Sequence, residues 1–169
     1  MQLMVVLDEF NSMEAAWLRP ALLDCCDVPE WADALLDARP YPDLDSLLGT
    51  AEQLAGALRP EAVERALAAH PRIGERAPGP GRGASWSREE QSRIDADVET
   101  AAALHSANRL YEKRFGRVFL ICATGLTSSE VLAALLLRLG NDPETEAAVV
   151  AVELRKIALL RLRRVVVPA

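Results

Sequence analysis

Apolar residues recur along this chain with the three-to-four-residue spacing of amphipathic helices. No stretch shows the sustained apolar–polar alternation of a half-buried strand. Together with proline and glycine breaks, the spacing predicts a short helix within residues 8–19, capped at Asn11 or Ser12. It also predicts helices over residues 21–26, 29–38, 43–58, 60–70, 87–115, 128–139 and 143–165. We therefore expect an all-α fold, a single-domain bundle of about eight helices over residues 1–169.

Two stretches lack a helical pattern. Residues 75–86 are rich in glycine and proline and predict a loop, either a plain connection or a lid beside His70. Residues 118–123 form an apolar run that fits a buried strand or a buried helix equally well. Between them, Ser87 and Glu90 match the S-x-x-E capping box, which predicts that the 87–115 helix begins there.

His70 is predicted at the end of the 60–70 helix, on the same face as Val63, Ala66 and Leu67. Pro71 cannot continue a helix, so the chain stops there and turns away. A lone histidine on an apolar face is usually a core residue whose ring nitrogens bond to the backbone. A functional interpretation therefore needs partners elsewhere in the chain.

Two such partners are predicted on other helices. Arg161 lies on the apolar stripe of the 143–165 helix, with Val150, Leu154 and Ile157. A buried guanidinium is costly unless it meets an anion, so Arg161 binds a substrate anion, pairs with a carboxylate such as Glu90, or extends its stem to solvent. Glu90 is four residues before Ile94 and can point inward as well as cap.

His70, Glu90 and Arg161 are thus three ionisable side chains on faces meant for the core. This pattern indicates a polar pocket in an apolar frame, as in small-molecule sites. Arg161 suits a carboxylate, and His70 can exchange a proton because an unperturbed imidazole has a pKa of about 6.5. Glu90 can orient that imidazole. The set favours chemistry in which a bound anion loses carbon dioxide or gains a proton.

Composition excludes several other classes. The formal charge of −6 and the pI near 5.0 give no electrostatic footprint for nucleic acid or an anionic membrane. Three cysteines and two histidines show no metal-ligand spacing, and no phosphate-binding glycine motif occurs, so we expect no metal and no cofactor. We expect a soluble cytoplasmic protein without a signal peptide; its oligomeric state is open, a homodimer included.

Several short motifs in order along the chain resemble the 2-oxo-4-hydroxy-4-carboxy-5-ureidoimidazoline (OHCU) decarboxylases of urate degradation. H-P-R-I-G at 70–74, S-x-x-E-Q at 87–91 and C-A-T-G at 122–125 are specific in combination. Further matches are Phe10-Asn11, Cys25-Cys26, Trp31-Ala32, residues 39–43, Asn108, Tyr111, residues 113–116, Lys156-Ile157 and residues 160–162. The chain departs from the family at Leu126, where a basic residue is frequent, and in its short 75–86 loop.

The resemblance implies an all-helical, cofactor-free lyase of purine metabolism that converts OHCU to (S)-allantoin and carbon dioxide. It implies that His70 is the catalytic acid, acting with Glu90 and Arg161. The substrate pocket would be lined by Pro71, Ser87, Glu90, Gln91, Arg161 and the backbone of Phe119, Leu120, Ile121, Cys122 and Ala123. Two alternatives stay open: a non-catalytic helical interaction module, and a lyase acting on another small ureido acid.

Overall fold

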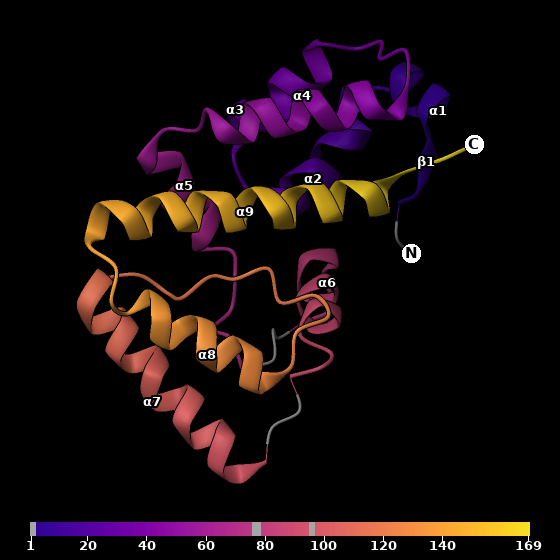
Figure 1. Ribbon diagram of the computed structural model, residues 1–169. Coiled ribbons are helices and arrows are strands. Elements are labelled where there is room, and N and C mark those ends of the chain that lie inside the picture. The colour runs from indigo at the N-terminus through magenta and orange to yellow at the C-terminus, as the bar shows by residue number, and fades with distance from the viewer. Residues whose placement is uncertain (1–2, 76–78, 95–96) are drawn as a thin grey trace. The chain divides into compact units, whose positions relative to one another are not determined.

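The computed structural model describes residues 3–75, 79–94 and 97–169. Over these ranges the protein is helical apart from loops and two short strands, so the all-α prediction is confirmed (Figure 1). The elements are β1 (Val5–Val6), α1 (Leu7–Ser12), α2 (Ala15–Cys25), α3 (Pro29–Asp37), α4 (Leu44–Gly56), α5 (Pro60–Leu67), α6 (Arg82–Glu90), α7 (Val98–Phe115), α8 (Ser128–Arg138), α9 (Pro143–Val165) and β2 (Val166–Val167).

The chain divides into two compact units. Unit 1 comprises Met1–Ala69 and Leu154–Ala169, and unit 2 comprises His70–Glu153. Helix α9 therefore contributes its first half to unit 2 and its second half to unit 1. A single domain over residues 1–169 stays a prediction.

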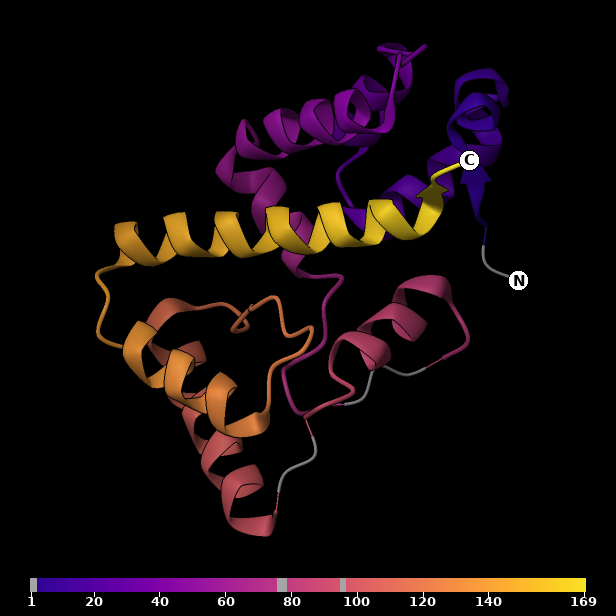
Figure 2. The same ribbon diagram turned by 45° about the vertical axis from the view of Figure 1, so that its right-hand side comes forward.

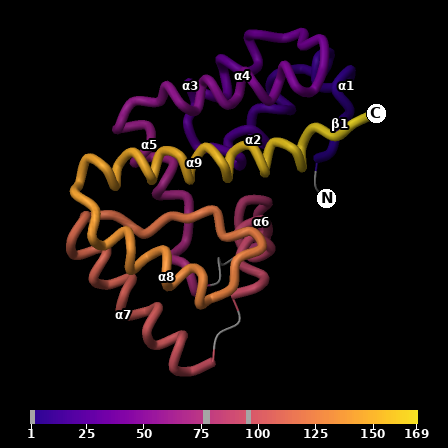
Figure 3. Tube along the Cα trace, viewed as in Figure 1, coloured from indigo at the N-terminus to yellow at the C-terminus, as the bar shows by residue number. Residues whose placement is uncertain are grey.

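In unit 1, α2 and α4 both pack against α3, and the indole Nε1 of Trp31 donates a 3.1 Å hydrogen bond to the carbonyl of Ala51. Helix α4 is capped by Asp43, whose carboxylate accepts a 2.7 Å hydrogen bond from the Ser46 amide. The two strands pair in parallel, with Val5 opposite Val166, so β1 lies beside the yellow C-terminal end of the tube in Figure 3.

In unit 2, α7 and α8 lie side by side, and residues 116–127 run back along α8 (Figures 1 and 2). Gly116, with φ +70°, ends α7 as predicted, since only glycine adopts this conformation readily. These segments enclose one apolar cluster: Ile73, Leu104, Ala107, Tyr111, Phe119, Ile121, Ala123, Val131 and Leu135.

Three predicted boundaries near the site are wrong. Helix α5 ends at Leu67, so His70 lies beyond its helix, because the residue before a proline avoids helical geometry. Ser87 and Glu90 do not begin a helix; they form the last turn of α6, which starts at Arg82 inside the predicted 75–86 loop. The N-cap of α7 is Asp97, whose carboxylate accepts from the Thr100 amide at 2.7 Å.

Three further expectations also need correction. Asn11 and Ser12 end α1 rather than capping the start of a helix, and α2 runs through Pro20 to Cys25 instead of giving a separate helix over 21–26. Residues 118–123 form neither strand nor helix, although Phe119, Leu120 and Ile121 are buried. Of the predicted 75–86 loop and 87–115 helix, residues 76–78 and 95–96 lie outside the described residues.

Candidate active site

The segment that carries His70 is anchored from both sides in unit 2. His70 is half-buried in the bend after α5. The side-chain oxygen of Gln91 accepts a 2.9 Å hydrogen bond from the Gly74 amide, and Asn108 Nδ2 donates to the carbonyl of Ile73 at 2.9 Å. Gly74 has φ +91°, so a side chain there would be strained. The turn after His70 is thus held in place by the end of α6 and by α7.

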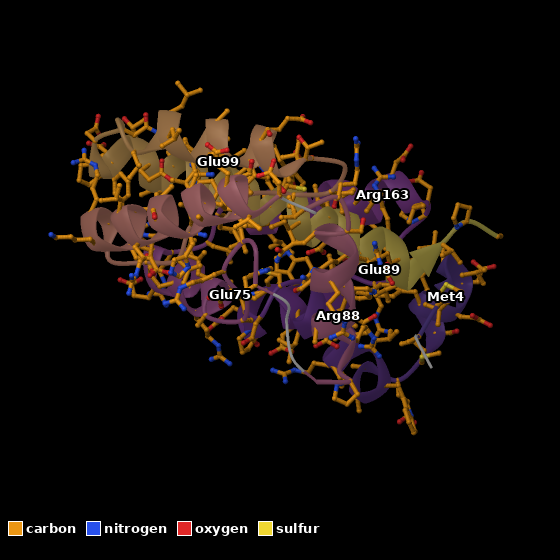
Figure 4. The ribbon with its side chains drawn as sticks, turned by 90° about the horizontal axis from the view of Figure 1, so that it is seen from below. Met4, Glu75, Arg88, Glu89, Glu99 and Arg163 are labelled. Atoms are coloured by element: carbon orange, nitrogen blue, oxygen red, sulfur yellow. The ribbon has the colours of Figure 1, made fainter. Side chains whose placement is uncertain are left out.

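The last turn of α6 places the predicted polar residues. Ser87 is buried, Glu90 is half-buried and Gln91 is the C-cap. The helix is tied to its surroundings by two arginines: Arg88, labelled on α6 in Figure 4, donates to the carbonyl of Gly79 at 3.0 Å, and Arg93 donates to that of Gly125 at 2.7 Å. The second bond joins the turn after α6 to the loop that contains C-A-T-G.

The 119–123 segment is held by side chains of α8 and α9. Arg138 Nη1 donates a 2.7 Å hydrogen bond to the carbonyl of Leu120, and a carboxylate oxygen of Glu153 accepts from the Cys122 amide at 3.2 Å. The Arg138 guanidinium also lies over the Phe119 ring, 4.4 Å from its centroid. Hydrogen bonds therefore connect the three predicted segments of unit 2 into one framework.

Behind this framework lies a buried ion pair between Arg138 and Glu146. Glu146 accepts from Arg138 Nε at 2.8 Å and Nη2 at 2.6 Å, from the Tyr111 hydroxyl at 2.6 Å and from Asn141 at 3.0 Å. Burial favours the neutral acid, yet these hydrogen bonds, led by Arg138, outweigh it and lower the pKa of Glu146. Burial, followed by the bond to Glu146, raises the pKa of Tyr111. The pair joins α7, α8 and α9 with charge retained on Glu146.

Arg161 belongs to unit 1, unlike the other predicted site residues. It is 3% exposed, which confirms that it faces the apolar side of α9, and its Nη1 donates to the carbonyl of Asp24 at 2.9 Å. It also acts on the neighbouring Cys26: burial and then Asp27 raise the pKa of that thiol to about 12, while Arg161 opposes the rise. The convergence of Arg161 with His70 and Glu90 stays a prediction.

Two open pockets of unit 2 border the His70 segment. One, of about 360 Å³, is lined by Gly74, Glu75, Arg88, Gln91, Ser92 and Ile94, and so includes one predicted site residue. The other, of about 290 Å³, lies against α7 and includes His105 and Asn108 but none of the predicted site residues. The second pocket therefore does not support the predicted site.

Three residues of this framework, Arg138, Glu146 and Glu153, were not predicted from the sequence. The signal was present for all three: Arg138 is on the stripe of α8 that carries Val131 and Leu135, and both glutamates are on the stripe of α9 that carries Val150. Each of them is thus an ionisable residue on the apolar stripe of a helix, as Arg161 is. What the sequence could not supply was the identity of the partners.

A metal site and a membrane-spanning helix are both absent from the parts of the chain that the structure describes. No group of three or more His, Cys, Asp or Glu side chains there could hold a metal ion. Likewise, none of the described helices combines the length and the apolarity that crossing a bilayer requires. The cysteines of the described ranges are free thiols, two of them buried.

A model of the OHCU decarboxylase family matches residues 11–163. The chain belongs to the OHCU decarboxylase family. The match spans both units, from α1 to the last turn of α9, and so includes every predicted site residue.

Individual relatives agree with this assignment. The chain is 30% identical to the 2-oxo-4-hydroxy-4-carboxy-5-ureidoimidazoline decarboxylase of Amia calva over 82% of this chain and 81% of that one. It is 32% identical to the uric acid degradation bifunctional protein TTL of Arabidopsis thaliana over 83% of this chain, and spans only 44% of that protein's length. A crystal structure of OHCU decarboxylase in the presence of (S)-allantoin superposes with a TM-score of 0.71 at 29% identity, covering 89% of this chain and 96% of that one.

Proposed function

We propose that this protein is a cofactor-free carboxy-lyase that converts OHCU to (S)-allantoin in urate degradation. The observation that carries the proposal is family membership over residues 11–163. It is supported by the relative from Amia calva, which bears the name of this decarboxylase and is matched over most of its length.

In this proposal His70 is the catalytic acid, Glu90 orients its imidazole, and Arg161 binds a carboxylate or ring oxygen of the substrate. Pro71, Ser87, Gln91 and the main chain of residues 119–123 line the pocket. Support comes from the hydrogen bonds in unit 2, since Gln91 holds the turn after His70 and since Arg138 and Glu153 hold the main chain at Leu120 and Cys122.

The proposed reaction needs one bond cleavage and one protonation. The bond from C4 to the carboxylate breaks and carbon dioxide leaves, and the electron pair passes into the adjacent unsaturated carbon–nitrogen unit of the ring. Hydrogen-bond donors in a water-poor site stabilise this developing charge. His70 then delivers a proton to one face of the ureido-bearing carbon, which sets the configuration of allantoin. The C4 hydroxyl becomes a carbonyl as its proton passes to the ring nitrogen that received the electron pair.

The test generates OHCU in place, from urate with urate oxidase and hydroxyisourate hydrolase, and follows the circular dichroism of the allantoin formed. The wild-type protein should accelerate the appearance of the S enantiomer over the slow racemic decay. His70→Asn should remove the acceleration with the helical dichroism intact, because asparagine keeps polarity but has no proton that it can transfer to the substrate.

The chain offers a matched control, because it has only two histidines. His105 is exposed on α7, and His105→Asn should retain wild-type activity. A wild-type protein that leaves the racemic decay unchanged would favour the non-catalytic helical module. Activity on other small ureido acids but not on OHCU would favour the alternative lyase.

Location and assembly complete the proposal. We place the protein in the cytoplasm, in keeping with its three free thiols, and a homodimer is the assembly to test first by light scattering. Neither a nucleic acid nor an anionic membrane is proposed as a partner, because the net charge of −6 disfavours binding to either polyanion.

A further inference from the structure

The main-chain amide and carbonyl groups of the 118–123 segment need hydrogen-bond partners. The segment has no regular secondary structure, so its amide and carbonyl groups lack the partners that a helix or a sheet would supply. Phe119, Leu120 and Ile121 are nonetheless buried. Buried main-chain groups are almost always hydrogen-bonded, so side chains or a ligand must take this role.

Two buried side chains do so, on either side of Ile121. Arg138 holds the carbonyl of Leu120 at 2.7 Å, and Glu153 holds the amide of Cys122 at 3.2 Å. Arg138 is itself immobilised, with Glu146 on two of its nitrogens and the Phe119 ring below its guanidinium plane. A planar fork fixed in this way sets the direction of the carbonyl that it binds.

The planarity of the peptide bond then determines the directions in which the N–H and the C=O of Ile121 point. In a trans peptide unit the C=O and the N–H point in opposite directions. Because Arg138 holds the Leu120 carbonyl, the Ile121 amide of the same unit points away from Arg138. Because Glu153 holds the Cys122 amide, the Ile121 carbonyl of that unit points away from Glu153. Within the described ranges, neither main-chain group of Ile121 has a hydrogen-bond partner.

We propose that Arg138 and Glu153 are positioning residues that clamp the main chain on both sides of Ile121 and so offer its N–H and C=O, as a donor–acceptor pair, to the substrate. This inference rests on the proposed function for the identity of that substrate. A ureide carries an N–H beside a C=O and is complementary to such a pair. Neither positioning residue touches the substrate; both act through the backbone that does.

The test compares Glu153→Met, which removes the acceptor, with Glu153→Gln, which keeps an oxygen in the same place. In the coupled assay, Glu153→Met should lower kcat/KM about 10- to 100-fold, mainly through kcat, and reduce the excess of the S enantiomer, because a displaced pocket wall misorients the substrate. Glu153→Gln should stay within about fivefold of wild type. Glu144→Met, at an exposed position in the first turn of α9, is the matched control.

Amide hydrogen exchange supplies a readout that does not require activity. Peptides covering residues 118–124 should exchange faster in Glu153→Met, and in Arg138→Lys, whose single ammonium cannot hold both Glu146 and Leu120, than in wild type. Unchanged exchange in both variants would overturn the clamp. Faster exchange with unaltered kcat and enantiomeric excess would overturn its role in catalysis. An inactive wild-type protein would refute the proposed function instead, and the exchange data would still decide the clamp.

Discussion

Replacing Glu146 by glutamine tests the buried ion pair of unit 2 most directly. The variant keeps the shape of the side chain but removes its charge. Glu146 is fully buried and accepts four hydrogen bonds, two of them from Arg138, whose side chain is only 10% exposed. Glutamine would leave that guanidinium buried without a counter-charge.

The expected loss follows from this geometry. Removing one partner of a buried pair costs about 3–5 kcal/mol, because the other charge stays desolvated. A protein of this size loses about 2–4 °C in Tm per kcal/mol, so the midpoint should fall by about 6–20 °C. Arg138→Met combined with Glu146→Gln removes both charges and should cost less than the sum of the single variants.

The dependence of the free energy of unfolding on pH should change as well. The pKa of Glu146 is lowered in the folded protein, so its contribution is complete above the ordinary value of 4.5 and is lost as the pH falls through the lowered value. Urea unfolding, followed by circular dichroism at 222 nm between pH 7 and pH 3, measures the loss in the free energy of unfolding and its dependence on pH. The exposed Glu144→Gln serves as the control. A loss below about 1 kcal/mol at pH 7, or an acid dependence equal to that of wild type, would refute the reasoning.

Three further outcomes are expected. Burial raises the pKa of Tyr41 to about 12 and raises that of Tyr111, so absorbance at 295 nm should show no tyrosine ionising near pH 10 while the protein is folded. Because both shifts are upward, stability should fall as the pH rises from 10 towards 12, and tyrosine ionisation should coincide with the loss of helical dichroism. Burial also raises the pKa of Cys26 to about 12, so iodoacetamide at pH 8 should label the half-buried Cys122 first, as judged by mass spectrometry; equal labelling would contradict this. Asp43→Ala should cost about 1 kcal/mol in urea unfolding through loss of the α4 cap, and an unchanged midpoint would mean that the cap contributes nothing.

The local sequence pattern predicted a helix start at Ser87 that the structure does not have. Ser87 and Glu90 fit a capping box, but that motif is only two polar residues at a spacing that also occurs within helices. The choice depended on Arg82 to Trp86, a stretch whose neighbouring glycines and prolines favoured a loop and which forms the first turns of α6. The site prediction tolerated this error, since Ser87, Glu90 and Gln91 remain together at one helix end.

The sequence by itself determined the helical class, most helix boundaries, the burial of Arg161 and the family, because periodicity, caps and short motifs act over a few residues. Only the tertiary structure decided that residues 118–123 are irregular and that Arg138, Glu146 and Glu153 support them. The physical reason is that a buried charge is stable only beside its partner. That partner lies on another helix, at a separation that no local pattern encodes.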